Sequence, residues 1–178
     1  MGNKKKTVRI IGPGKAGCSL GTALERKGWV LEDYLGRGDN LQNAAQLVDL
    51  LVIATPDEII SETAKKVLPN PETVITHLSG ALGLDALSPH ESCMSLHPLA
   101  SLPDSDLGAD LLGSGIWFGI SEHELAKEIA IELGKAQTDI ILQRDMAEEK
   151  EKRTNTLMVF SAFAIGAIAL SFILTRKK

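Results

Sequence analysis

Two short segments of the chain place histidine and serine side chains where strands are expected to end. The first is His77-Leu78-Ser79-Gly80 and the second is His97-Pro98. An imidazole can exchange a proton near neutral pH, and a serine hydroxyl beside glycine can orient a polar ligand. We therefore take His77, Ser79 and His97 as candidate catalytic residues, and Ser79 and Gly80 also as candidate cofactor contacts.

A purely structural role is the alternative for both strand-end histidines. Histidines at such positions often only bond a backbone carbonyl or pack beneath a loop. The other two, His90 and His123, fall in an expected loop and in the first turn of an expected helix, and we assign them no chemistry. No Cys–His or Ser–His–Asp arrangement and no metal cluster can be read from the spacing, so we expect no metal site.

A glycine-rich segment near the start of the chain is typical of phosphate binding. The apolar run at 8–11 leads into three glycines spaced G-x-G-x-x-G, and a helical pattern follows. In such a unit the first glycine makes the tight turn, the second admits a pyrophosphate, and the third lets the helix pack close to the strand. The N–H groups at the helix start then bind the phosphates. The segment predicts a dinucleotide site made by Gly12, Pro13, Gly14, Lys15, Ala16 and Gly17.

The end of the second expected strand, over 29–35, bears on which dinucleotide is bound. An acidic residue that closes this strand favours the free 2′-hydroxyl of NAD, whereas an arginine there accommodates the 2′-phosphate of NADP. Glu32 and Asp33 have the right distance from Gly12 but fall inside the expected strand, and Arg37 lies in the turn that follows. The sequence therefore favours NADP. NAD through Glu32 or Asp33 is one alternative, and a merely solvated Arg37 is another.

Thr55 and Pro56 follow the buried strand expected over 49–54. With Thr55 as N-cap, Pro56 as the first helical residue and Glu58 three positions after the cap, they form a capping box that predicts a helix to about residue 67. Their place at the carboxyl end of a strand beside the glycine turn also makes Thr55 and Pro56 candidate cofactor contacts. The two roles are compatible.

Strands and helices alternate along most of the chain. The remaining expected elements include a short helix over 41–48, a long loop over 99–115, a helix opened by a capping box of Ser121 and Glu124, and a last strand over 138–142. This alternation predicts an α/β fold with a doubly wound, mostly parallel sheet. Ligands of such sheets bind outside the carboxyl ends of the strands, so the candidate residues are expected to converge on one cleft.

The composition restricts the class of protein. The chain has 178 residues, of which 44% are hydrophobic, and a net charge of −4, which fits one domain of ordinary size and argues against a nucleic-acid partner. Cys18 and Cys93 are too few for a disulfide framework. No apolar leader precedes the first expected strand, so we expect the domain to be cytoplasmic.

Several segments in one order resemble the N-terminal Rossmann domain of a bacterial NADP-binding family. That family is similar to ketopantoate reductase, pyrroline-carboxylate reductase and the 6-phosphogluconate dehydrogenase group. The likeness covers about residues 7–143 and implies NADP(H) binding, with a nicotinamide and substrate end near Ser79, Gly80 and His97. The segments that carry it are 10–17, 35–37, 51–57, 77–80, 95–99 and 115–118.

The sequence departs from that family after about residue 143. Family members continue into a helical second domain that helps to close the substrate site and to form dimers, whereas here a charged linker over 144–153 leads to an uncharged segment over 154–175 and a basic tail over 176–178. A helix of that length, at about 1.5 Å per residue, spans a bilayer. We expect a C-terminal apolar transmembrane helix that anchors the domain over 1–143. The alternative is a helix packed on that domain.

Three hypotheses of function follow. The first is an NADP-dependent oxidoreductase that reduces a small carbonyl or imine substrate, with the missing half of its substrate site supplied by a homodimer or a partner. The second is a membrane-tethered NADP(H)-binding module without turnover, and the third is a truncated relative whose tail has no selected role. The strand-end residues that a catalyst needs are all retained, which favours the first. The sequence does not identify the substrate.

Overall fold

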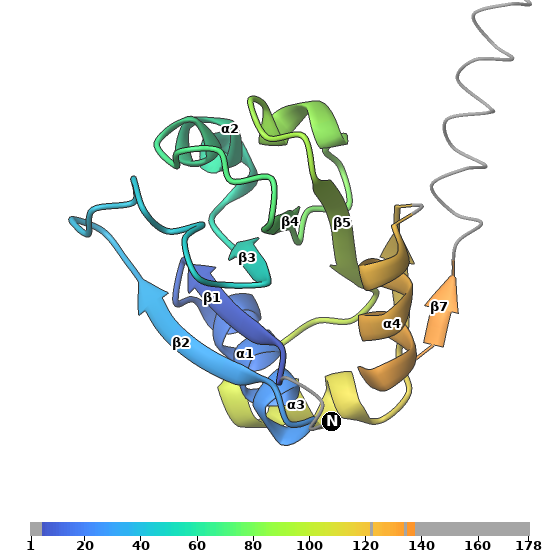
Figure 1. Ribbon diagram of the computed structural model, residues 1–178. Helices are drawn as coiled ribbons and strands as arrows, with labels where there is room; N and C mark the ends of the chain where they lie inside the picture. Colours follow the sequence, from blue (N-terminus) through green and yellow to red (C-terminus); the bar gives the residue numbers. More distant parts are fainter. Residues whose placement is uncertain (1–4, 122, 134, 138–178) are drawn as a thin grey trace, which may run out of the picture. The chain divides into compact units, whose positions relative to one another are not determined.

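The computed structural model describes residues 5–121, 123–133 and 135–137, which belong to the compact unit Met1–Thr138. Strands and helices alternate through this unit except between β2 and β3, which no helix separates, as Figure 1 shows. The elements in chain order are β1 (Thr7–Ile11), α1 (Lys15–Arg26), β2 (Val30–Leu35), β3 (Leu50–Ile53), α2 (Asp57–Lys65), β4 (Val74–His77), the 3-10 helix η1 (Leu84–Leu87), β5 (Cys93–Pro98), α3 (Ser105–Gly113), β6 (Trp117–Ile120), α4 (Glu124–Leu133) and β7 (Lys135–Gln137).

The described strands form a seven-stranded sheet in the order β2-β1-β3-β4-β5-β6-β7. The pairs from β2 to β5 are parallel, β6 runs antiparallel to β5, and β7 is parallel to β6. The register places Ile53 beside His77, and His77 beside Ser95. The carboxyl ends of β3, β4 and β5 therefore lie next to one another, which confirms the mostly parallel α/β sheet and brings the candidate segments to one edge.

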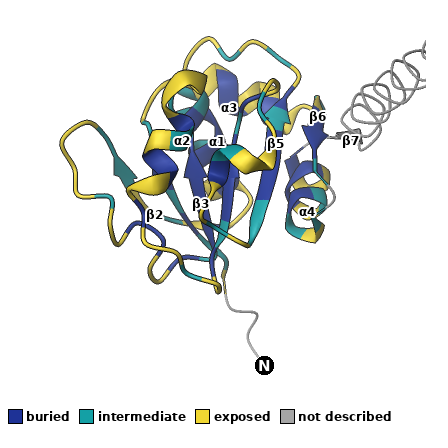
Figure 2. Ribbon diagram, turned by 90° about the horizontal axis from the view of Figure 1, so that it is seen from above, coloured by how far each residue is buried: buried dark blue, intermediate teal, exposed yellow. Residues whose placement is uncertain are grey.

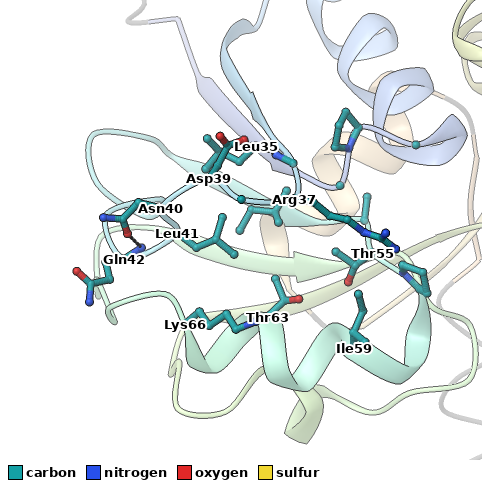
Figure 3. Close-up of a pocket in the computed structure, with 18 of the residues that line it drawn as sticks. Leu35, Arg37, Asp39, Asn40, Leu41, Gln42, Thr55, Ile59, Thr63 and Lys66 are labelled. Carbon is teal, nitrogen blue, oxygen red and sulfur yellow. Dashed lines mark hydrogen bonds between the residues drawn. The ribbon is translucent and has the colours of Figure 1, made fainter.

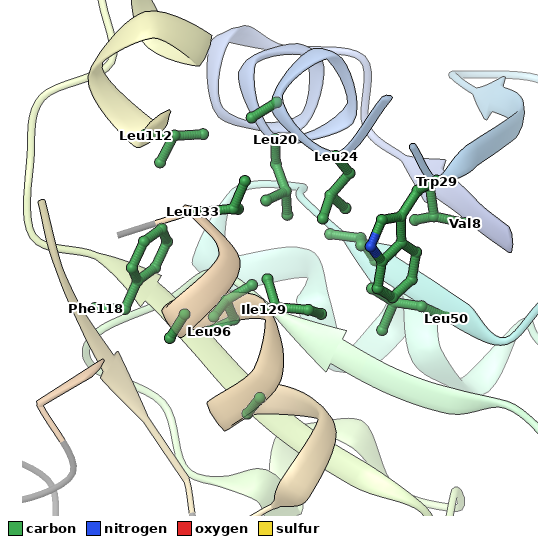
Figure 4. Packing of buried hydrophobic residues seen from close by; sticks show 14 of the residues in the cluster. Val8, Leu20, Leu24, Trp29, Leu50, Leu96, Leu112, Phe118, Ile129 and Leu133 are labelled. Carbon is green, nitrogen blue, oxygen red and sulfur yellow. The ribbon is translucent and has the colours of Figure 1, made fainter. Parts of the chain in front are cut away.

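Two hydrophobic cores lie on opposite faces of the sheet because buried strand residues alternate between them (Figure 2). Val52 belongs to the core that includes residues of α1, α3 and α4, whereas Ile53 belongs to the core that includes residues of α2 and η1. Figure 4 shows Leu20, Leu112 and Ile129, from three different helices, among the residues of the first of these cores. With helices on both faces, the sheet is doubly wound.

The loop prediction over 99–115 is wrong, because helix α3 occupies Ser105–Gly113. The Asp104 side chain accepts hydrogen bonds from the N–H groups of Asp106 and Leu107 and so caps the helix start. A Cβ on Gly108 would lie 2.0 Å from Oγ of Ser19 in α1, so Gly108 lets the two helices approach closely. The aspartate and glycine that indicated a loop here are a helix cap, Asp104, and a helix–helix contact, Gly108.

The helix predicted over 41–48 is also wrong, because this segment is a series of turns. Its carbonyl groups bond side chains from elsewhere in the domain: Arg9 donates to Ala44 O, and Thr73 Oγ1 donates to Ala45 O at 2.6 Å. Leu47 has a φ of +61°, which a helix does not allow. Long-range hydrogen bonds thus override the local helical pattern.

Neither predicted capping box forms. Helix α2 has Pro56 as its N-cap with no side-chain cap, and helix α4 begins at Glu124 after His123, whose Nδ1 accepts from the N–H of Leu125. The Oγ of Ser121 instead accepts a hydrogen bond from the N–H of Ser95 on β5. The hydroxyl that the local pattern assigned to a helix cap is therefore used in a hydrogen bond to a neighbouring strand.

The expected strand over 138–142 and the segments over 144–153, 154–175 and 176–178 lie outside the described residues, although β7 at Lys135–Gln137 precedes them. None of the described helices is long and apolar enough to cross a membrane.

Candidate functional site

The turn between β1 and α1 needs two of its three glycines for packing. Gly12 has a φ of +96°, and a Cβ there would lie 2.7 Å from Ala54 O. A Cβ on Gly17 would lie 2.3 Å from Gly12 O, so α1 approaches β1 more closely than any side chain permits. The backbone N–H of Gly12 donates to Leu35 O, and that of Ala54 donates to Ile11 O, both at 2.8 Å. These contacts bind the turn to the ends of β2 and β3.

Gly14, the second glycine, is not required by packing within the protein. A Cβ on Gly14 would meet no atom within 4 Å, and its φ of −86° suits any residue. Gly14 is also the N-cap of α1, where it supplies no side-chain cap, and the first turn of the helix holds no acidic residue. The N–H groups of Lys15, Ala16 and Gly17 precede the first helical bond, which runs from Cys18 N to Gly14 O. The open space and the uncapped, positively polarised helix start fit an anion such as a phosphate.

A pocket of about 860 Å³ opens beside this turn (Figure 3). It is bounded by the turns after β1 and β3, by the segment after β2, and by one side of α2. Of the predicted cofactor contacts, it is lined by Gly12, Pro13, Gly14, Arg37, Thr55 and Pro56. Lys15, Ala16 and Gly17 follow in the helix start and do not line the pocket, and Ser79 and Gly80 do not line it either. The predicted residues thus divide between the pocket and a second cluster.

Arg37 lines the pocket from the segment after β2. Figure 3 shows its side chain extending toward Thr55 and Ile59. Lys65 and Lys66 also line the pocket, and Lys66 pairs with Glu62 at 2.7 Å. The alternative ribose acids, Glu32 and Asp33, are exposed along β2 and do not line it.

Sequence reasoning missed several residues of this pocket. Asp39 is one of them, and its carboxylate accepts from the N–H of Gly36 at 2.7 Å, so it shapes the loop that presents Arg37. Ile59 and Thr63 are two others, and their four-residue spacing puts them on one side of α2. That helical spacing, together with the position of α2 after Pro56, is the signal in the sequence from which they could have been found.

Thr55 carries an unusual polar atom. Its Oγ1 is buried and has no hydrogen-bond partner among the described residues, although the pocket borders the residue. A buried hydroxyl without a partner costs free energy, and native structures rarely leave one unless a ligand or water binds it. The cap role predicted for Thr55 is wrong, and its hydroxyl has no partner within the described part of the chain.

Beyond Pro56, the chain enters the second cluster at Asp57. The Oγ of Ser79 donates to Oδ2 of Asp57 at 2.7 Å and accepts from the N–H groups of Ala81 and Leu82 at 3.1 and 3.2 Å. Ser79 is buried, whereas Asp57 is exposed in the first turn of α2. Sequence reasoning assigned no site role to Asp57, and its place directly after Thr55 and Pro56 was the available signal.

His97 is held over the same turn. Its Nδ1 lies 2.8 Å from Leu78 O, and a carbonyl oxygen can only accept a hydrogen bond, so Nδ1 carries the proton. The ring also packs on Gly80, where a Cβ would lie 2.6 Å from Nε2 and from Cδ2 of His97. In the neutral ring, Nε2 therefore has the free lone pair.

His77 lies beneath these groups and is fully buried. Neither ring nitrogen has a hydrogen bond of normal geometry within the described structure. Burial lowers the pKa of His77, and the nearby backbone of Gly83, the Asp57 carboxylate and the backbone of Ser79 only partly offset that effect. A neutral, buried imidazole suits support of the turn better than direct contact with a ligand.

The carboxyl ends of neighbouring strands thus bring His77, Ser79, Gly80 and His97 together, as the sequence predicts. Pro56 and Asp57 connect this cluster to the pocket. Within the described residues, no group of three or more His, Cys, Asp or Glu side chains is placed to hold a metal ion.

No protein-family model and no curated protein matches the sequence. Among solved structures, a reductive aminase from Aspergillus terreus in complex with NADPH and ethyl-5-oxohexanoate is similar at 13% identity with a TM-score of 0.59, covering 75% of this chain and 55% of its own. A Bacteroides fragilis protein described as an NADP oxidoreductase is 16% identical with a TM-score of 0.59, over 89% of this chain and 70% of its own.

A prephenate dehydrogenase from A. aeolicus, in complex with hydroxyphenyl propionate and NAD+, is 16% identical with a TM-score of 0.60, covering 77% of this chain and 60% of its own. This chain spans little more than half the length of the reductive aminases that it resembles. Identities this low show the fold alone. The described domain has the Rossmann-like fold of NAD(P)-dependent reductases and dehydrogenases.

Proposed function

We propose that this protein binds NADP(H) in the pocket between β1, β2 and β3. The observation that carries the proposal is the uncapped start of α1, where Gly14 leaves open space beside a pocket that also holds Arg37. A helix start with free N–H groups attracts phosphate, and an arginine at the end of the second strand suits a 2′-phosphate. The orphaned Oγ1 of Thr55 offers a further hydrogen bond to the bound cofactor.

Different residues would bind different parts of the cofactor. The pyrophosphate would lie on the N–H groups of Lys15, Ala16 and Gly17, beside Gly12, Pro13 and Gly14. Arg37 would pair with the 2′-phosphate, and Thr55 and Pro56 would border the path toward the second cluster. Ser79 and Gly80 would stand at the nicotinamide end.

We further propose that the protein is an oxidoreductase that reduces a small carbonyl or imine group. Bound NADPH supplies the hydride, and reduction of such a group also needs a proton. Nε2 of His97 would supply that proton from the imidazolium form of the ring, which then becomes neutral, because the bond from Nδ1 to Leu78 O leaves Nε2 as the exchanging atom. The A. terreus enzyme crystallised with NADPH and an oxo-ester supports this substrate class by fold analogy.

Direct titration of the full chain tests the cofactor. NADPH and NADH would be added in turn while the nicotinamide fluorescence is followed, and we expect saturable binding with preference for NADPH. Absence of saturation with either dinucleotide would overturn the proposal. Equal affinity would retain the pocket but contradict the role of Arg37.

The segment over 154–175 supports a membrane anchor as an addition to this function, because it contains no charged residue over a length sufficient for a bilayer. Expression of the full chain followed by alkaline carbonate extraction of membranes tests it. We expect the protein to stay with the membranes, and we expect Ile165→Lys with Leu170→Lys to release it. Release of the unaltered chain would contradict the anchor.

A further inference from the structure

The hydroxyl of Ser79 is fully used within the protein. A serine hydroxyl offers one donor and two acceptor positions. The donor bonds Oδ2 of Asp57, and the N–H groups of Ala81 and Leu82 occupy the acceptor side. Ser79 therefore has no donor left for a substrate in this arrangement. Its hydrogen bonds instead tie the turn after β4 to the first residue of α2.

The residues of that turn, 78–80, either contact His97 directly or hold the turn in place beneath it. Leu78 O accepts the hydrogen bond from Nδ1, Ser79 is anchored to Asp57, and Gly80 lies against the imidazole ring. Since these residues are consecutive, a shift of Ser79 would move the carbonyl that fixes the His97 tautomer and the backbone on which the ring packs. The position of His97 thus depends, through the turn, on the Asp57 carboxylate, which hydrogen-bonds Ser79 rather than the ring.

Asp57 is also coupled to the pocket through the chain. It follows Pro56, which lines the pocket, and it opens α2, whose residues Ile59 and Thr63 line the same pocket. One hydrogen bond therefore connects the element that borders the dinucleotide to the turn that holds the proton-exchanging ring.

We infer that Asp57 is a positioning residue: through Ser79 it holds the 78–80 turn so that His97 keeps its proton on Nδ1 and presents Nε2 for proton exchange with substrate. The inference rests on the proposed reductase function for its purpose. It assigns Ser79 to the same positioning role and leaves His97 as the catalytic residue. The arrangement itself can be tested without any substrate.

The test uses 15N-labelled full-length protein and the long-range 1H–15N spectrum of its histidine rings, in which the protonated and unprotonated nitrogens of each neutral ring have distinct shifts. We expect the unaltered protein to show His97 protonated on Nδ1. Asp57→Ala and Ser79→Ala should each weaken that signature and mix in the Nε2-protonated form, and the double variant should add nothing further. Asp57→Asn keeps an oxygen that accepts from Ser79 and should restore the signature.

Glu58→Ala is the matched control, because it removes a carboxylate from the same helical turn and should leave His97 unchanged. If Asp57→Ala leaves the His97 signals at their original shifts, the inference is overturned. If Asp57→Ala does not fold, the other two variants test the inference. Unchanged His97 signals in Ser79→Ala would contradict it, and so would loss of the Nδ1-protonated form in Asp57→Asn.

A parallel NADPH titration separates this inference from the proposed function. Asp57 does not line the pocket, so Asp57→Ala should bind NADPH within about twofold of the unaltered protein. Failure of the unaltered protein to bind NADPH would remove the proposed function while the histidine spectrum still reports on the Asp57–Ser79–His97 arrangement.

Discussion

Ser79 and Asp57, 22 residues apart in the chain, are joined by a hydrogen bond of 2.7 Å that ties the end of β4 to the start of α2. On one side of this bond lies the pocket with its uncapped helix start, and on the other lies the ring of His97. The candidate site therefore has two parts, the pocket and the His97 cluster, and the Ser79–Asp57 hydrogen bond connects them.

The stability of the linkage can be measured. Asp57→Ala leaves the buried donor of Ser79 without its partner, which should lower the free energy of unfolding by about 1 kcal/mol. Asp57→Asn should cost less, because an amide oxygen still accepts from Ser79. Urea unfolding of both variants checks the difference, with Glu58→Ala as control. Equal losses for all three variants would show that the Ser79 bond contributes nothing.

Gly14→Ala should separate binding from folding. The added methyl meets no atom of the protein within 4 Å, so the fold should be retained, with the melting temperature lowered only by a few degrees because alanine is a weaker N-cap than glycine. The same methyl would occupy space beside the helix start, and we expect NADPH affinity to drop by about tenfold or more, since close approach of the backbone to pyrophosphate is the purpose of this glycine. Gly113→Ala, at another open glycine, is the matched control. Unchanged affinity in Gly14→Ala would place the phosphates elsewhere.

Arg37→Gln should change dinucleotide preference. Loss of a charge-assisted bond to the 2′-phosphate should weaken NADPH binding by about tenfold, while NADH binding stays within about twofold. Arg26→Gln is the control, because Arg26 ends α1 and pairs with Asp110 away from the pocket. Fluorescence titration gives both affinities. A parallel loss for NADPH and NADH would indicate that Arg37 supports the loop rather than the phosphate.

Gly80→Ala should displace the His97 ring by steric contact, while the ring nitrogens and the Leu78 carbonyl stay chemically unchanged. The new Cβ would lie 2.6 Å from Nε2, so the ring must move away from Leu78 O. The histidine spectrum should show loss of the Nδ1-protonated form, as in Asp57→Ala. Unchanged His97 signals in Gly80→Ala would mean that the turn can shift away from the ring without altering the hydrogen bond of Nδ1.

The buried His77 predicts a pH dependence of stability. Burial lowers its pKa in the folded protein below the ordinary value of 6.5, so only the unfolded chain gains a proton as the pH first falls below that value. Stability from this group is therefore complete above about pH 6.5 and declines as the pH falls toward the folded pKa. His77→Gln should flatten the profile between pH 7.5 and 5.0 in urea unfolding. A parallel decline in the variant would assign the effect to other groups.

Much of the fold could be predicted because its signals are local or periodic. The apolar runs of β1, β3 and β4 and the helical spacing in α1 each identify an element within a few residues. The expected turn at Gly12 is confirmed by its positive φ and by its contact with Ala54. The two segments that were predicted wrongly depend on distant partners. Arg9 and Thr73 bond carbonyls in 41–48, where no helix forms, and Ser19 packs against Gly108 in the unpredicted helix α3.

The sequence by itself determined the types of chemistry available: a glycine turn open to phosphate, an arginine after the second strand, and imidazoles at strand ends. Only the tertiary structure decided which atoms meet. Within the described residues it left the Thr55 hydroxyl without a partner, saturated the Ser79 hydroxyl through Asp57, and fixed the proton of His97 on Nδ1. The reason is physical, because spacing along a chain determines which elements form, whereas the register of parallel strands and the packing of helices on them determine which donors find acceptors.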